Sequence, residues 1–179
     1  MGLFDIFKKE KVKKQQVKRE ITKFKYDKSK YQWDSAAKEY YNQFGITYED
    51  LIDKDKELIW DYAGNHIAFF MTWIIQNNYL SSLHADEKED IEAVKNENMK
   101  GNDFLMNNCD GVLSREDLSD EILEFVDLYY DTHYLNDYCA CMETQLHRTI
   151  LGIGFSWEDY NCFKNVIDEA YKRYKEENM

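Results

Sequence analysis

The 179-residue sequence contains no proline and only seven glycines. An average chain of this length would carry roughly nine prolines, so the composition argues against a collagen-like, proline-rich or turn-dense all-β protein. The most apolar stretch, residues 67–75, is far shorter than the roughly 20 residues that a membrane-spanning helix needs. Long helices are therefore the expected structure.

The chain also lacks the short motifs that mark common catalytic and nucleotide sites. It has no G-x-x-x-x-G-K-[ST], G-x-G-x-x-G, H-E-x-x-H, G-x-S-x-G or C-x-x-C sequence. We therefore expect no cofactor. The four cysteines do not follow a zinc or disulfide spacing, and no secretory signal precedes them, which predicts reduced thiols in a cytoplasmic protein. The sequence does not indicate the oligomeric state.

Charge is abundant but unevenly distributed. The formal net charge is −12, yet residues 1–30 hold eleven basic against four acidic side chains, and the remainder holds twelve against 31. We expect a basic, partly disordered leader at 1–30 and an acidic helical domain at 31–179. Because the acidic domain would repel phosphates, a nucleic-acid partner is not expected, whereas a basic protein partner is. The leader, residues 2–25 in particular, could bind an anionic membrane surface.

The hydrophobic pattern predicts an all-α fold, an irregular bundle of six to eight helices around a buried central helix. Hydrophobic residues make up 44% of the chain, enough for a core. The central helix is expected to start at Asp61 and to contain residues 63–75, which are apolar on every face. Thr47 with Asp50, and Ser114 with Asp117, have the spacing of capping boxes. Residues 144–155 are the only stretch whose pattern fits extended structure as well as helix, and a short hairpin is the alternative there.

Several polar residues are candidates for chemistry, each beside a structural alternative. His66 lies on the central helix and could act as a base or metal ligand with Asp110 and Asp137, or could simply be a hydrogen-bonded core histidine. A weaker metal-binding set comprises His133, Asp137 and His147, whose spacing matches no structural zinc pattern. We therefore assign no catalytic residue and no metal ligand from the sequence.

The candidate partner-binding residues form an acidic segment that ends in an aromatic residue. They are Asp120, Glu121, Glu124, Asp127 and Tyr130. Carboxylates would attract a cationic partner at long range, and an aromatic side chain would supply a buried anchor at the interface.

Four ordered motifs resemble a bacterial family of small cytosolic helical proteins without an assigned biochemical function. These motifs are Ala63-x-x-His66-Ile67-x-x-Phe70-x-x-Trp73, Cys109-Asp110-Gly111-x-Leu113-x-x-Glu116-Asp117-Leu118, Tyr134-x-x-Asp137-Tyr138 and Trp157-x-x-Tyr160. The resemblance covers roughly residues 26–175 and implies no catalytic residue. Such proteins are loosely similar to immunity proteins of polymorphic-toxin loci.

Three functions remain open at this point. The first is a non-enzymatic protein-binding module, such as an immunity-type inhibitor of a basic toxin or effector. The second is a small metal-dependent or acid/base enzyme centred on His66. The third is a membrane-surface adaptor that uses the basic leader.

Overall fold

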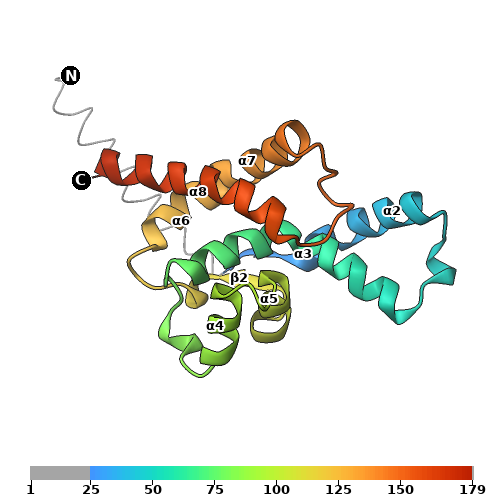
Figure 1. The fold of residues 1–179 in the computed structure, drawn as a ribbon, viewed down its shortest axis with the longest axis horizontal. Helices are drawn as coiled ribbons and strands as arrows, with labels where there is room; N and C mark the ends of the chain where they lie inside the picture. The colour runs from blue at the N-terminus through green and yellow to red at the C-terminus, as the bar shows by residue number, and fades with distance from the viewer. Residues whose placement is uncertain (1–24, 179) are drawn as a thin grey trace, which may run out of the picture.

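The structure is a computed structural model, and it describes residues 25–178. It confirms an all-α, irregular helical bundle with a small two-stranded sheet (Figure 1). The α-helices and strands are β1 (Lys25–Lys28), α2 (Trp33–Phe44), α3 (Asp53–Gln76), α4 (Lys88–Lys95), α5 (Gly101–Cys109), β2 (Val112–Ser114), α6 (Leu123–Tyr129), α7 (Leu135–Ala140) and α8 (Trp157–Asn178).

Short helical turns connect these elements. The 3-10 turns are η1 (Ser29–Gln32), η2 (Tyr48–Asp50), η3 (Ser82–His84) and η4 (Arg115–Asp117). The π-helical turn η5 (Tyr130–Tyr134) joins α6 to α7, and a second π-helical turn, η6 (Cys141–Gln145), extends the same helical segment beyond α7. No helix within residues 25–178 is long and apolar enough to cross a membrane.

Helix α3 is the centre of the fold. Between Tyr62 and Ile75 every residue is buried, because α4 and α5 cover one side of the helix and α8 covers another (Figure 1). Trp73 is completely enclosed, and its indole Nε1 donates a hydrogen bond of 2.8 Å to Asp168 on α8. The buried central helix expected from its apolar residues is thus confirmed.

The start of α3 differs from the expectation. The sequence predicted that the central helix starts at Asp61, whereas the structure has one continuous helix from Asp53. The first turn is capped by Asp55, which accepts a hydrogen bond of 3.0 Å from the Ile52 backbone N–H. Asp61 lies in the middle of the helix, where its carboxylate accepts a hydrogen bond from Asn102 on α5 instead of capping a helix end.

Helices α3 and α5 approach closely at Gly101. A Cβ atom on Gly101 would lie 1.8 Å from the Thr72 hydroxyl oxygen and 2.8 Å from the Ala68 carbonyl oxygen. The Thr72 hydroxyl already donates a hydrogen bond of 2.7 Å to that same carbonyl. The absence of a side chain at this position therefore sets the distance between the two helices.

The extended structure of the fold lies outside the segment where the sequence analysis considered it. Strands β1 and β2 pair antiparallel, with Lys25 opposite Ser114 and Lys28 opposite Val112. Strand β1 lies within the last residues of the range 1–30. No strand forms between residues 144 and 155 in the described chain, so the expected hairpin is wrong. This segment instead runs as a loop that buries Phe155 against Phe69, with ring centroids 5.2 Å apart.

Candidate functional site

His66 lies in a buried polar cluster between β1, α3 and η5. Its Nε2 is 3.0 Å from the Asp27 carboxylate, which also accepts a hydrogen bond of 3.1 Å from the Tyr130 hydroxyl. Burial alone would raise the pKa of Asp27, but the hydrogen bonds and charge that His66 provides outweigh this effect and lower it. Asp27 is therefore held as a carboxylate, and it fixes the orientation of the imidazole.

The surroundings of His66 are closed by tyrosine hydroxyl groups. Tyr134 donates a hydrogen bond to the His66 carbonyl oxygen, and the Asn65 side-chain amide donates to the Tyr138 hydroxyl over 3.2 Å. Both tyrosines are fully buried, and His66 is 3% exposed. Such an arrangement orients an interior histidine, but it leaves little room for a substrate beside the ring.

The structure does not pair His66 with the acids considered from the sequence. Asp110 is the left-handed C-cap of α5, with a φ of 52°, and its side chain is exposed. Asp137 accepts a hydrogen bond of 2.9 Å from Tyr129. No hydrogen bond or ion pair within residues 25–178 joins His66 to either acid. The actual partner, Asp27, lies 39 positions earlier in the chain, and sequence spacing gave no signal for it.

The three weaker metal candidates separate into two places. His133 and Asp137 line one groove between the α6–α7 segment and α8, together with Arg173 and Tyr174. His147 is exposed on the loop that follows η6, with a φ of 52°, and it does not line this groove.

The five candidate contact residues also fall into two groups. Asp120, Glu121 and Glu124 are exposed. Asp127 forms an ion pair with Arg115 and accepts a hydrogen bond of 2.6 Å from Tyr26, while Tyr130 is 7% exposed and holds Asp27. The fold therefore uses Asp127 and Tyr130 internally, and only the other three face the solvent.

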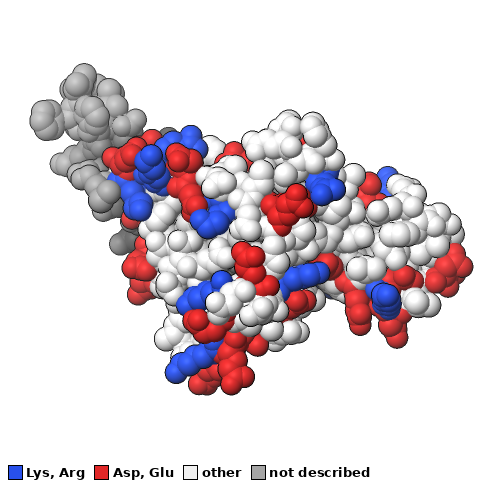
Figure 2. Space-filling view, in the orientation of Figure 1, with Lys and Arg blue, Asp and Glu red and all other residues white. Residues whose placement is uncertain are grey.

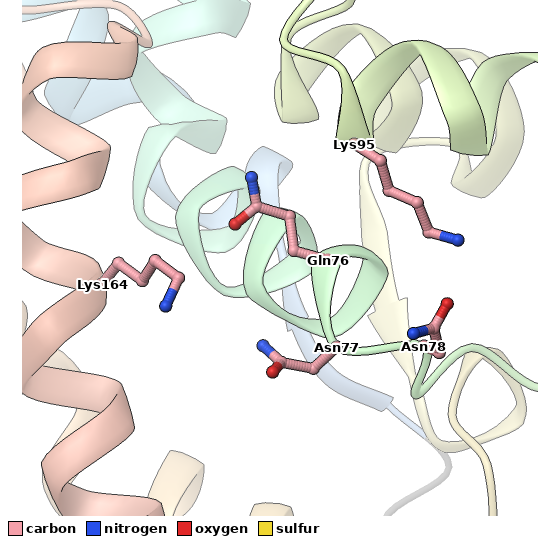
Figure 3. A pocket seen from close by; sticks show the side chains of 5 residues that line it. All are labelled: Gln76, Asn77, Asn78, Lys95 and Lys164. Atoms are coloured by element: carbon pink, nitrogen blue, oxygen red, sulfur yellow. The ribbon is translucent and has the colours of Figure 1, made fainter.

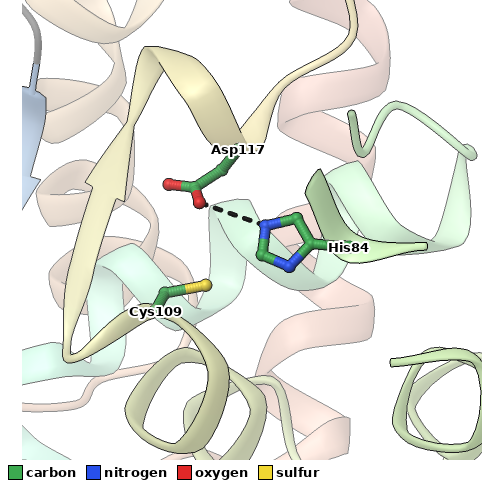
Figure 4. Close-up of side chains that lie close together, drawn as sticks. All are labelled: His84, Cys109 and Asp117. Atoms are coloured by element: carbon green, nitrogen blue, oxygen red, sulfur yellow. Dashed lines mark hydrogen bonds and ion pairs between the residues drawn. The ribbon is translucent and has the colours of Figure 1, made fainter. Parts of the chain in front are cut away.

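A second histidine, which the sequence analysis passed over, lies in a cluster with a cysteine and an aspartate (Figure 4). His84 ends η3, Cys109 ends α5, and Asp117 ends η4. One potential ligand atom from each lies within 4.8 Å of the others, and the His84 Nε2 is 3.1 Å from the Asp117 carboxylate. Asp117 also fills the capping role that its spacing from Ser114 predicts, because it accepts hydrogen bonds from the Ser114 backbone and hydroxyl.

A polar pocket of about 450 Å³ lies beyond the C-terminal end of α3 (Figure 3). Its lining includes Asn77 and two lysines, Lys95 from α4 and Lys164 from α8. Each lysine is already paired with a carboxylate, Lys95 with Glu92 and Lys164 with Asp168. The pocket therefore has little positive charge left with which to hold an anionic ligand.

The end of the molecule formed by α2 and the start of α3 has exposed apolar side chains among carboxylates. Phe44, Tyr48 and Ile52 are 50%, 65% and 62% exposed. The acidic side chains around them include Glu49, Asp53 and Glu57, all exposed, and Figure 2 shows carboxylates over this end of the molecule. We call these six residues the α2–α3 tip.

Comparison with known proteins yields one match. Residues 25–151 match a family model described as "Domain of unknown function (DUF7832)". The match begins at β1, the first element of the described fold. No curated protein and no solved structure matches the chain. Since the matched segment covers more than half of the sequence, the chain belongs to the DUF7832 family of unknown function.

Proposed function

We propose that this protein is a non-enzymatic binding module that recognises a basic protein through the α2–α3 tip. The observation that carries the proposal is the exposure of Phe44, Tyr48 and Ile52 on an acidic domain. Within residues 25–178 there are 15 basic and 32 acidic side chains, a net charge of −17. An immunity-type inhibitor of a basic toxin or effector is the most specific form of this function.

Electrostatics supports a cationic partner. An excess of carboxylates accelerates encounter with a basic protein and slows encounter with nucleic acid or an anionic membrane. The acids of the tip are available for this purpose. Glu49 and Glu57 are exposed, and the side chain of Asp53 is 95% exposed although it contacts Lys56. Such rim charges affect the association rate and its salt dependence more than the final affinity.

The apolar side chains of the tip would supply the affinity. Folding leaves these three large residues half or more exposed, and they occur within residues 44–52, where α2 ends, η2 forms and α3 begins. Only a minority of interface residues cost more than about 1 kcal/mol when truncated, and tyrosine is one of the residue types enriched among them. The tip thus combines anchors with a charged rim, as protein interfaces do.

The tip is held in a defined shape, which lowers the entropic cost of binding. Asp50 accepts hydrogen bonds of 2.9 and 2.8 Å from the backbone and hydroxyl of Thr47, and this capping interaction lowers the pKa of Asp50. Asp55 accepts a hydrogen bond of 2.7 Å from Tyr40, which ties the start of α3 to α2.

The proposal is tested with synthetic peptides of equal length and apolar content, whose net charge runs from strongly positive to strongly negative. Binding is measured by fluorescence anisotropy to the full chain. We expect the basic peptide to bind and to weaken steeply with salt, and the triple variant Phe44→Ser, Tyr48→Ser, Ile52→Ser to lose at least tenfold in affinity. Binding that ignores peptide charge would contradict the proposal.

A matched control locates the contact. The triple variant Asp120→Asn, Glu121→Gln, Glu124→Gln neutralises the three exposed acids of the acidic segment that the sequence analysis named as a candidate contact surface. It should bind the basic peptide within about threefold of the unmodified chain, because it leaves the apolar anchors of the tip in place. If this control loses binding and the tip variant keeps it, the contact surface lies at α6 and the tip is excluded.

A further inference from the structure

We infer that His84, Cys109 and Asp117 form a binding site for a divalent transition-metal ion of the zinc class. The three residues come from η3, α5 and η4, and the fold alone brings them together (Figure 4). Imidazole nitrogen, thiolate sulfur and carboxylate oxygen are the three ligand types that zinc prefers.

The geometry fits a mononuclear site. Bond lengths of about 2.0 Å to nitrogen or oxygen and 2.3 Å to sulfur, at tetrahedral angles, place ligand atoms roughly 3.3 to 3.6 Å apart. The His84 Nε2 and Asp117 Oδ1 atoms are 3.1 Å apart, and all three ligand atoms lie within 4.8 Å. The three side chains can thus provide three of the four corners of a tetrahedral site.

Two unpartnered atoms beside the cluster form an independent observation. The Nδ1 of His84 and the Oε2 of Glu87 are both buried, and neither has a hydrogen-bond partner among residues 25–178. They lie 3.9 Å apart, while His84 is only 3% exposed. Buried polar atoms are rarely left without a partner, so this pair calls for an explanation.

Metal binding at Nε2 would supply that explanation. In a neutral ring whose Nε2 donates to the Asp117 carboxylate, Nδ1 would be an acceptor that faces a second acceptor on Glu87. With a metal ion on Nε2, the ring proton moves to Nδ1 and can be donated to Glu87. A carboxylate behind the second ring nitrogen is the usual support of a metal-bound histidine.

The electrostatic surroundings favour a metal ligand over a nucleophile. Burial, followed by the carboxylates of Asp117, Glu87 and Asp110, raises the pKa of the Cys109 thiol. A catalytic thiolate needs the opposite environment, with a nearby positive charge. A bound dication would supply that charge, and the thiol proton would leave to the solvent on binding. Cys109 is the one partly exposed ligand of the three, so water would fill the fourth position on its side.

The test uses Co²⁺ added to the purified full chain after removal of metals with a chelator. We expect one Co²⁺ per chain, with a thiolate-to-cobalt charge-transfer band that Zn²⁺ abolishes. The variant Cys109→Ala should lose this band and at least tenfold in affinity. The matched control Cys139→Ala, which removes another partly buried thiol on α7, should keep both.

A second variant addresses the role of Glu87. Glu87→Gln should weaken Co²⁺ binding by about tenfold or more while the band persists, because the ligands remain and only their support is lost. The competing explanation is a protonated His84 that bridges Asp117 and Glu87 without metal. Absence of the band in the unmodified chain, its survival in Cys109→Ala or its loss in Cys139→Ala would overturn the metal site.

Discussion

The contact between α3 and α5 allows a stability prediction to be worked from distances. In the variant Gly101→Ala, the new methyl group would lie 1.8 Å from the Thr72 hydroxyl and 2.8 Å from the Ala68 carbonyl. Overpacking of this kind costs about 1–3 kcal/mol, and a backbone carbonyl cannot rotate away. Replacing glycine returns about 0.4–1 kcal/mol through the unfolded state. We expect a net loss of about 1–2 kcal/mol in the free energy of unfolding.

A double-mutant cycle identifies the cause of that loss. Thr72→Ala alone should cost about 1 kcal/mol, because it removes the hydrogen bond of 2.7 Å to Ala68. In the double variant the closest clash is gone, and the contacts with the Ala68 carbonyl oxygen at 2.8 Å and with the Cβ atom of residue 72 at 3.1 Å remain. The combined loss should therefore fall short of the sum by at least about 1 kcal/mol. Urea denaturation followed by tryptophan fluorescence measures all four proteins.

Gly45 provides the matched control. It has a φ of 65°, and a Cβ there would meet nothing within 4 Å. Gly45→Ala should cost about 1 kcal/mol from backbone strain alone and should show no coupling to Thr72→Ala. The reasoning fails if the free energy of unfolding of Gly101→Ala lies within about 0.5 kcal/mol of that of the unmodified chain. It also fails if the losses of the two single variants add up to the loss of the double variant within about 0.3 kcal/mol.

The remaining predictions concern buried polar groups and are measured by denaturation across pH. Burial alone would raise the pKa of Asp27, but its interactions, those with His66 above all, outweigh burial and lower it. The ionised carboxylate therefore stabilises the folded protein above pH 3.8, the ordinary pKa of an aspartate, and this stabilisation is lost as the pH falls. Asp27→Asn should thus lower the free energy of unfolding by about 1–3 kcal/mol at pH 7. If the variant remained equally destabilised below pH 3.8, the stabilisation would not come from ionised Asp27. Burial raises the pKa of Asp61 despite the hydrogen bond from Asn102. The buried charge therefore costs stability at pH 7, so Asp61→Asn should leave the free energy of unfolding unchanged or increase it. A large decrease in that free energy would contradict this reasoning. Tyr134→Phe removes the hydroxyl that donates to the His66 carbonyl and should cost about 1 kcal/mol, whereas an unchanged midpoint would show that the bond contributes nothing.

Local patterns in the sequence predicted the helices well. The apolar run of α3 indicated a helix buried on all sides, and the structure confirms it. The capping interactions at Thr47 and Ser114 also form as expected. These features depend on residues three or four positions apart, and such spacing is visible in a single sequence.

Contacts between distant segments could not be predicted in this way. The partner of His66 comes from β1, and its position depends on the pairing of β1 with β2, which lies more than 80 residues away. The cluster of His84, Cys109 and Asp117 likewise depends on how η3, the end of α5 and η4 come together. The expected hairpin at 144–155 failed because Phe155 is buried against α3 from a loop, without any strand partner.

The π-helical turn η5 has a consequence for the row of buried tyrosines at positions 130, 134 and 138. Four steps along an α-helix overshoot a full turn by roughly 40°, whereas four steps along the wider π-helix fall short by a similar amount. The shortfall of the π turn between residues 130 and 134 therefore offsets the overshoot of the α turn between residues 134 and 138, and all three rings stay directed at α3. Loss of a single residue from this turn would swing everything downstream by about 100°. The length of this segment is thus as tightly constrained as the identity of its aromatic residues.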